Sequence, residues 1–210
     1  MKNNLLPIAK EGWSYIGYSV ASLIIFSILD LDFFQLVSFV FVVFFLFVFR
    51  NPERELPHFE QSSVLCPVDG EVISIDTLND SEYAYKVTID TGYKDVGILR
   101  VPMNGTVLSY RKMNGTRLSL EDSQVLKTNE NISIIFEDSN ENKVEVLHTV
   151  KQSLCGVHAD LTEGSTVAQS ARYGLMVNGR TELFLPQNFR LSLIIGEETT
   201  ASESLVGYFS

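Results

Sequence analysis

Two apolar runs near the amino terminus constrain the fold of this chain more than any other feature. Residues 13–29 and 33–49 each contain 17 residues and carry no charged side chain. As α-helices they would each reach roughly 25 Å, near the lower limit for crossing a hydrocarbon core of about 30 Å. The second run is apolar on every face, which is typical of a helix without a water-facing side. The runs predict a membrane-embedded helical hairpin within residues 1–50, as two short spans or as one re-entrant pair.

The charged residues around the two runs predict an orientation. Asp30 and Asp32 lie between the runs, and because acids are costly in lipid they mark a polar tip where the chain reverses. Lysines precede the first run and arginines follow the second, which places both ends in the cytoplasm by the positive-inside rule. A cleaved signal peptide is disfavoured because the second run follows at once. We expect the cytoplasmic membrane, with both termini and the remaining domain on the cytoplasmic side. Two buried helices of a soluble protein are the alternative.

The composition changes after residue 50. Charge and proline in residues 51–63 end the helical pattern and predict a linker. In residues 64–210 the apolar signals are short, rich in β-branched and aromatic residues, and separated by Gly, Asn, Asp or Pro. They are EVISI, YKVTI, GTVLSY, ISIIFE, KVEVLHTV, ELFLP and RLSLIIG. This pattern predicts a mostly β fold, a compact sandwich or barrel-like β domain that follows the helical hairpin.

Charge and residue usage exclude several classes of function. The formal net charge of −10 argues against nucleic acid as a partner, since nucleic-acid binders present clustered Lys and Arg. Cys66 and Cys155 show neither CxxC nor Cys/His ligand spacing, and the three histidines show no HExxH spacing, so no metal site is predicted. A transporter is disfavoured because the apolar runs contain no ionisable residue that could line a polar path.

Several short segments, taken in their order along the chain, point to a family. They are IAKEGW (8–13), FFLFVFRNPERELP (44–57), CPVDGEV (66–72), DVGILRVPMNGTV (95–107), TNENISIIFE (128–137) and EGSTVAQSARYGLMVNGRTELFLP (163–186). With these segments the chain resembles the short, membrane-attached form of phosphatidylserine decarboxylase over essentially its whole length. The resemblance implies membrane phospholipid as the partner and phosphatidylethanolamine synthesis as the pathway.

The resemblance also implies a zymogen and a particular chemistry. In that family the proenzyme cuts itself at a Gly-Ser bond, and the serine becomes a pyruvoyl group at the amino terminus of the smaller fragment. The pyruvoyl ketone forms a Schiff base with the substrate amine and accepts electrons as carbon dioxide leaves. An Asp and a His assist the serine, because a hydroxyl needs a base to act as a nucleophile near neutral pH.

The family's processing residues are only partly present. Asp69 in CPVDGEV stands at the family's Asp position, although Asp69-Gly70 on its own also fits a hairpin turn. The family's His position is occupied by Gly97. Counting back from LFLP places Gly179 and Arg180 at the family's Gly-Ser pair, so the glycine remains and the serine is replaced. The segment is one residue shorter, and local chemistry predicts a two-residue hairpin turn at Asn178-Gly179 between two strands.

Other residues could in principle supply the missing groups. Ser165 follows Gly164 as in the family's long form, and cleavage there would leave a fragment of 46 residues. In the short form, however, the equivalent position is a plain Glu-Gly turn. Thr181 carries a hydroxyl but follows an arginine, while His148 and His158 could replace the base but fit structural roles better.

Two hypotheses follow. The chain is either a noncatalytic relative, defective in self-processing and pyruvoyl formation, or an active phosphatidylserine decarboxylase that uses an unusual site such as Gly164-Ser165. A pyruvoyl cofactor is expected only if the chain is processed. A homo-oligomer or a protein partner is compatible with either hypothesis.

Overall fold

The protein comprises two compact units, one ending at Glu53 and the other running from Arg54 to Ser210. The computed structural model describes residues 6–54, 62–79, 82–119 and 128–210. Most of the predicted linker, residues 55–61, lies outside the described residues. The two units are therefore described one at a time.

The first unit is a helical hairpin. Its elements are the 3-10 turn η1 (Lys10–Gly12), α1 (Trp13–Ile28) and α2 (Asp32–Val48). The helices pack through aromatic rings, with Tyr15 lying 5.4 Å from Phe45 and 5.3 Å from Phe49 between ring centroids. Asp30 has a φ of 52°, which reverses the chain between the helices. The predicted helical hairpin is confirmed. Helix α1 ends one residue before the end of the first apolar run, and α2 begins and ends one residue earlier than the second run.

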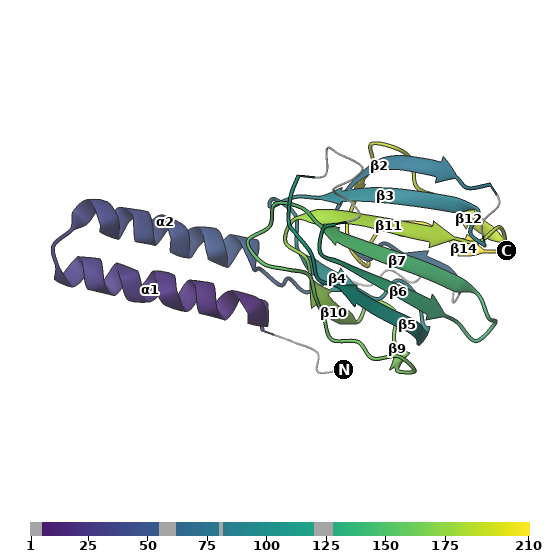
Figure 1. Ribbon diagram of the computed structural model, residues 1–210, viewed down its shortest axis with the longest axis horizontal. Helices are drawn as coiled ribbons and strands as arrows, with labels where there is room; N and C mark the ends of the chain where they lie inside the picture. The colour runs from purple at the N-terminus through teal and green to yellow at the C-terminus, as the bar shows by residue number, and fades with distance from the viewer. Residues whose placement is uncertain (1–5, 55–61, 80–81, 120–127) are drawn as a thin grey trace. The chain divides into compact units, whose positions relative to one another are not determined.

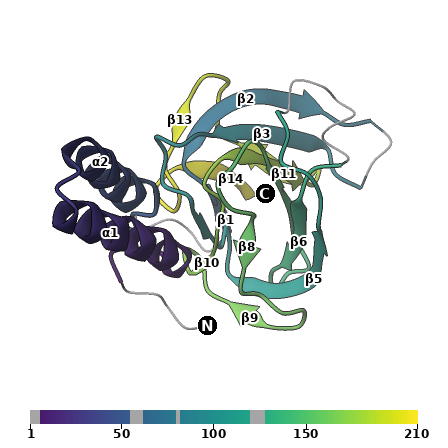
Figure 2. The same cartoon turned by 60° about the vertical axis from the view of Figure 1, so that its left-hand side comes forward.

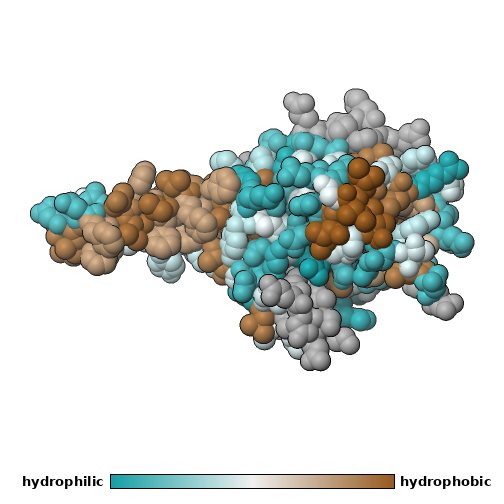
Figure 3. All heavy atoms as spheres, turned by 90° about the horizontal axis from the view of Figure 1, so that it is seen from above, coloured by the Kyte–Doolittle hydropathy of each residue, from teal (hydrophilic) through white to brown (hydrophobic). Residues whose placement is uncertain are grey.

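The outer surface of the hairpin is apolar. Figure 3 shows hydrophobic side chains covering most of this unit, with polar side chains at one end of it. Half or more of the residue's accessible surface is exposed at Ile24, Ile28, Phe33, Leu36, Phe39, Val40 and Val43. Among the described residues, no helix combines the length and the apolar content needed to cross a membrane.

The second unit is built almost entirely of β-strands, which confirms the predicted mostly β fold (Figure 1). Its main sheet has eight strands in the order β13-β2-β3-β11-β7-β6-β5-β9. These strands are β2 (Gly70–Thr77), β3 (Tyr85–Thr91), β5 (Gly105–Met113), β6 (Asn131–Glu137), β7 (Lys143–Val150), β9 (Thr166–Val167), β11 (Gly179–Leu185) and β13 (Glu198–Thr199).

Two small sheets complete the β unit. One has the order β1-β14-β12 and the other β4-β10-β8. Their strands are β1 (Ser63–Leu65), β4 (Ile98–Arg100), β8 (His158–Ala159), β10 (Arg172–Leu175), β12 (Phe189–Leu191) and β14 (Leu205–Phe209). The main sheet is strongly curved, with β2 and β3 at the top of Figure 2 and β5 and β9 at the bottom, but the sheets stay open.

The core lies on the concave side of the main sheet, and alternation explains which residues enter it. In β6 every second side chain is buried, namely Ile132, Ile134 and Phe136. The same period places Val144 and Val146 of β7 and Leu183 of β11 in one hydrophobic cluster. Since successive side chains of a strand point to opposite faces, the intervening residues form the outer face of the sheet.

One predicted turn and one predicted strand are wrong, and the alternative interpretation of Asp69-Gly70 as a hairpin turn is excluded. RLSLIIG is a strand only as far as Leu191, because a turn then exposes Ile194 and Ile195. Asp69-Gly70 does not close a hairpin, since β1 and β2 belong to different sheets. Asn178-Gly179 does not close one either, because β10 and β11 also lie in different sheets and neither residue has a positive φ.

Gly179 is required for a different reason than a turn. A Cβ atom at this position would lie 2.4 Å from the sulfur of Met176 and 2.6 Å from the carbonyl oxygen of Thr149. The chain passes from one sheet into the other at this point, and only a residue without a side chain allows that approach.

Candidate functional site

One end of the main sheet brings together three of the positions singled out in the sequence. Gly179 opens β11 and lies opposite Thr91 of β3. The Thr91 hydroxyl donates a hydrogen bond of 2.7 Å to the carbonyl oxygen of Asp69. Gly97 accepts a hydrogen bond of 2.7 Å from the amide of Met176, three residues before Gly179. Asp69, Gly97 and Gly179 thus surround the segment that leads into β11.

Backbone packing fills the space beside Gly97. A Cβ atom there would lie 2.9 Å from the carbonyl oxygen of Met176 and 3.1 Å from the Cα of Val177. Both neighbours are backbone atoms of the connector between β10 and β11, so they cannot rotate away as a side chain would. A larger residue at position 97 would therefore require this connector to move.

Asp69 is bound by charged and backbone donors. One of its carboxylate oxygens lies 2.6 Å from an Arg54 nitrogen, and the other accepts a hydrogen bond of 2.8 Å from the Ala201 amide. Both side chains of the ion pair are largely buried. Arg54 also approaches the Glu203 carboxylate at 3.9 Å. Asp69 thus ties the first residue of the β unit to the turn that precedes β14.

Arg180 projects from the outer face of β11 between two neighbouring strands. It lies opposite Asp90 of β3 and Thr149 of β7. Asp90 is already paired, because the Lys151 ammonium donates to its carboxylate at 2.6 Å. The Nε atom of Arg180 is buried, and no acceptor within the described ranges satisfies it.

Thr181, the next residue, points to the opposite face and enters the core. Its hydroxyl oxygen lies 2.8 Å from Nδ1 of His148, which is its cross-strand partner in β7. The Nε2 atom of His148 lies 2.5 Å from the Tyr173 hydroxyl oxygen. All three side chains are buried, so they form a closed chain of hydrogen bonds in which both ring nitrogens have a partner.

Burial determines the protonation state of the side chains in this Thr181–His148–Tyr173 hydrogen-bond chain. Removal from water disfavours the charged imidazolium and lowers the pKa of His148 to about 3. The same loss of hydration raises the pKa of the Tyr173 hydroxyl. His148 is therefore neutral near pH 7, and a base so reluctant to accept a proton is poorly matched to activating a hydroxyl.

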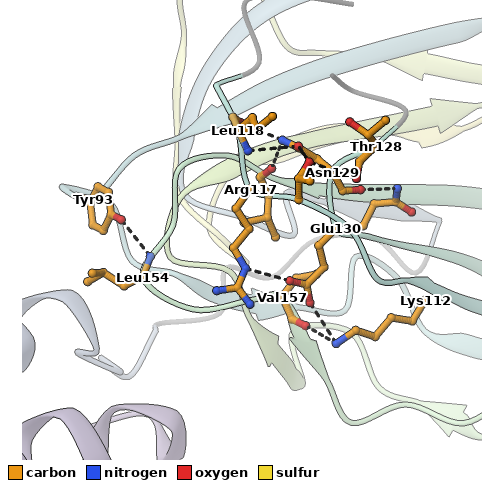
Figure 4. A network of polar contacts seen from close by, with 12 residues as sticks. Tyr93, Lys112, Arg117, Leu118, Thr128, Asn129, Glu130, Leu154 and Val157 are labelled. Carbon is orange, nitrogen blue, oxygen red and sulfur yellow. Dashed lines mark hydrogen bonds and ion pairs between the residues drawn. The ribbon is translucent and has the colours of Figure 1, made fainter. Parts of the chain in front are cut away.

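A second polar network supports the segment that runs beside this end of the sheet (Figure 4). The buried Asn129 amide donates to the carbonyl oxygens of Leu118 and Val150, each at 2.8 Å. The carboxylate of Glu130, also buried, lies 3.3 Å from the Lys112 ammonium and 3.1 Å from Nε of Arg117.

The supported segment is residues 151–157. Lys112 donates to the carbonyl oxygen of Val157 at 3.0 Å. On its other side, the Tyr93 hydroxyl donates to the Gln152 carbonyl at 2.9 Å and accepts from the Leu154 amide at 3.1 Å. These contacts brace the segment from both sides (Figure 4).

Ser165 and His158 lie elsewhere in the β unit. The Ser165 hydroxyl donates to the Thr162 carbonyl at 2.7 Å, in the turn before β9. β9 is the outermost strand on one side of the main sheet, and five strands separate it from β2, which follows Asp69. His158 lies in β8, opposite Leu175 of β10, and its side chain is exposed.

The residues at the start of β11 do not fit a pyruvoyl group. Such a group derives from a serine, and the Gly179–Arg180 peptide offers no hydroxyl. The adjacent hydroxyl, on Thr181, is directed into the core against His148. A metal has no better support, since the described residues contain no cluster of three or more His, Cys, Asp or Glu side chains that could hold one. Burial raises the pKa of the Cys66 thiol to about 11, which keeps it protonated.

Sequence reasoning missed several of these contacts. The Arg54–Asp69 pair joins residues that no periodic pattern relates. The His148–Thr181 contact did leave a signal, because both residues fall in the apolar phase of KVEVLHTV and RTELFLP. Since residues of one phase share a face, two polar side chains in that phase on neighbouring strands would meet in the core.

Comparison with known proteins gives a consistent result. The family model for phosphatidylserine decarboxylase matches residues 41–207. The phosphatidylserine decarboxylase proenzymes of Geobacter sp. (strain M21) and Geotalea uraniireducens (strain Rf4) are each 30% identical to this chain, over 99% of both chains. That of Burkholderia ambifaria (strain MC40-6) is 28% identical over 95% of this chain and 94% of its own length. With matches that extend from end to end, this chain belongs to the phosphatidylserine decarboxylase family.

Proposed function

We propose that this chain is a noncatalytic member of the phosphatidylserine decarboxylase family that stays uncleaved and binds phospholipid at the cytoplasmic membrane. The observation that carries the proposal is the packing at Gly97, the family's His position. Backbone atoms of Met176 and Val177 lie where a side chain would begin, so the site has neither a base nor room for one. The replacement of the family's serine by Arg180 supports the same conclusion.

The remaining candidate groups support it as well. His148 is bound to Thr181 and Tyr173 and is held neutral by burial. Asp69, which would orient a histidine in the family, is bound to Arg54 instead. Ser165 has its hydroxyl engaged at the far edge of the sheet. Each group that processing needs is absent, occupied or distant.

The helical hairpin supplies the proposed membrane attachment. Its exposed surface is apolar along both helices. Burying apolar surface away from water contributes about 25 cal/mol of favourable free energy per Å². The acids at its tip and the basic residues outside it favour an arrangement with the β unit on the cytoplasmic side. Headgroup binding by the β unit would then occur next to the lipid surface.

The mass of the purified full-length chain tests this proposal. We expect one species of 23.6 kDa and no release of carbon dioxide from phosphatidylserine vesicles. The Geobacter sp. (strain M21) proenzyme, prepared in the same way, is the positive control. Ser165→Ala and Thr181→Val variants are measured alongside.

Two fragments together with carbon dioxide release would overturn the noncatalytic proposal. The variants would then identify the nucleophile, because loss of cleavage in Ser165→Ala points to the bond at Gly164. Loss of cleavage in Thr181→Val alone would point to the start of β11.

A further inference from the structure

The turn between β12 and β13 exposes two isoleucines on the surface of the β unit. Ile194 and Ile195 keep 67% and 63% of their surface accessible. The turn closes where the Glu197 amide donates a hydrogen bond of 3.3 Å to the carbonyl oxygen of Ile194. Gly196 makes the turn possible with a φ of 85°, which side chains disfavour. The backbone thus presents both isoleucines at the tip of a tight turn.

This turn lies beside β2. The Gly196 amide donates to the Val72 carbonyl oxygen at 2.8 Å, and the Val72 amide donates to the Glu197 carbonyl oxygen at 3.0 Å. The next residue, Ile73, lies at a bulge in the pairing of β2 with β3 and is exposed as well. Figure 3 views the β unit from the side of β2 and shows a hydrophobic patch among polar side chains. The isoleucine patch consists of Ile73, Ile194 and Ile195. Single exposed apolar residues are ordinary, but contiguous ones mark interaction surfaces.

The edge of β2 next to this patch is open. β13 pairs only with the first two residues of β2, and from residue 74 onward β2 pairs with β3 alone among the described strands. The Leu78 amide donates toward β3, to the carbonyl oxygen of Ala84. Because ladder bonds alternate along an antiparallel strand, the amide and carbonyl groups of Ile75 and Thr77 point away from β3. Such an edge can accept one more strand.

Acidic side chains lie next to the patch and the open edge. Glu198 of β13, Glu71 of β2 and Asp90 of β3 stand opposite one another in the sheet. Glu71 and Glu198 are both exposed, and like charges directly opposite each other on neighbouring strands are unfavourable. Lysines pair with the two outer acids, whereas Glu71 forms no ion pair within the described ranges. A cation from a partner would relieve this repulsion.

We propose that the isoleucine patch and the open edge of β2 form a docking site for an extended segment of another protein, one that alternates apolar residues with Lys or Arg. The backbone of this segment extends the main sheet beyond β2. Its apolar side chains cover the isoleucines, and a cation meets Glu71. In this mode of recognition main-chain hydrogen bonds supply affinity and alternate side chains supply specificity.

The charge of the surface argues against two other occupants. A second copy of this chain would bring the same patch together about a two-fold axis, so that Glu71 and Glu198 would meet the same acids of the other copy. The cytoplasmic leaflet carries anionic lipids, which repel these carboxylates. A basic segment is the occupant whose charge complements this surface.

Binding of short peptides to the full-length chain in nonionic detergent micelles tests the docking site. The probe is a fluorescent peptide of about six residues, the usual length of a strand, in which lysine alternates with isoleucine. A second peptide carries glutamate in place of lysine, and a third carries N-methyl groups that remove its main-chain donors. We expect a saturable rise in fluorescence anisotropy with the lysine peptide and affinities weaker by about tenfold or more with the other two.

Variants of the chain locate the binding. Ile195→Ser shortens an exposed side chain of the turn and should weaken binding about tenfold, as expected when one buried isoleucine is lost. Glu71→Gln should weaken it about threefold and reduce its dependence on salt concentration. Leu108→Ser is the matched control, because Leu108 is exposed on β5 and four strands lie between β5 and β2. This variant should bind like the wild type.

Several results would overturn the inference. They are the absence of saturable binding, equal affinity for the lysine and glutamate peptides, and binding that Ile195→Ser and Glu71→Gln leave unchanged. A dimer that Ile195→Ser converts into a monomer, seen by light scattering, would assign the patch to a second copy instead. Loss of peptide binding on transfer to nanodiscs that contain phosphatidylglycerol would assign it to lipid. Full binding in the nanodiscs supports the docking site, whether or not the chain is cleaved.

Discussion

Arg180 and Thr181 are neighbours in β11, yet their surroundings differ completely. Thr181 faces the core, where its hydroxyl, the two His148 nitrogens and the Tyr173 hydroxyl form a chain with every ring nitrogen paired. Arg180 faces outward, where its buried Nε has no acceptor within the described chain. The difference teaches that the polar groups on the core side of β11 at this point are paired with one another, whereas the Nε of Arg180 on the outer side is not.

Asp69 extends this comparison, because each of its carboxylate oxygens has a partner, as the polar groups around Thr181 do. Asp69→Ala would leave Arg54 without its carboxylate and the Ala201 amide without its acceptor. We expect the free energy of unfolding to fall by about 3 kcal/mol, since removing one partner of a largely buried ion pair strands the other charge. Urea unfolding of the full-length chain measures this change.

The control for Asp69 is an exposed ion pair. Lys94→Ala removes the Lys94–Glu198 contact, in which both side chains are mostly exposed, and should cost less than about 0.5 kcal/mol. Equal losses in the two variants would show that Asp69 has no special structural role.

Acid should lower the free energy of unfolding through His148, the middle member of the Thr181–His148–Tyr173 hydrogen-bond chain. Its pKa is about 3 in the folded protein and about 6.5 when unfolded, so below pH 6.5 the unfolded state takes up a proton that the folded state refuses. Stability is therefore complete above pH 6.5 and falls as the pH drops toward 3, by at most about 1.4 kcal/mol per pH unit.

Unfolding free energies measured between pH 7 and pH 5 test this slope. Because carboxylates also titrate toward the acid end, the informative quantity is the difference between the wild type and His148→Gln. The variant should show a flatter dependence by up to one proton. Identical slopes would mean that His148 is not held neutral.

Thr181→Val tests the Thr181–His148–Tyr173 hydrogen-bond chain without changing a charge. Valine has nearly the same shape but leaves Nδ1 of His148 without its hydroxyl partner. We expect a loss of about 1–2 kcal/mol, the typical cost of a buried group left unpaired. A neutral or stabilising result would mean that the core tolerates an open hydrogen bond there.

Arg180→Leu is the matching change on the outer side and should have a smaller effect than Thr181→Val. Replacing a cation whose buried Nε lacks an acceptor removes a penalty along with some packing, so the unfolding free energy should change by less than about 1 kcal/mol. Circular dichroism during thermal unfolding provides the measurement. A loss larger than that of Thr181→Val would reverse the comparison between the two faces.

The sequence predicted the strands of the main sheet well, because their periodicity is local. KVEVLHTV and ISIIFE alternate cleanly, and both are strands in the structure. It failed at Asn178-Gly179, where an apolar run, a turn dipeptide and a second apolar run suggested a hairpin. The two strands instead join different sheets, and pairing between sheets depends on contacts far apart in sequence.

The candidate site was predictable in its positions but not in its bonding. The landmarks around Asp69, Gly97 and Gly179 could be placed from the order of motifs, and the structure gathers them at one end of the sheet. The partner of Asp69 could not be predicted, because Arg54 lies 15 residues earlier across a change in composition. The alternation of side chains could have placed Arg180 outside and Thr181 inside.

The close packing beside Gly97 has a consequence for mutation at this position. A histidine introduced at position 97 would drive its side chain into the backbone of Met176 and Val177. The connector between β10 and β11 would have to shift before that side chain fits, so a single substitution cannot add a base here without moving the entry into β11. The packing thus couples any change at position 97 to the chain around Gly179.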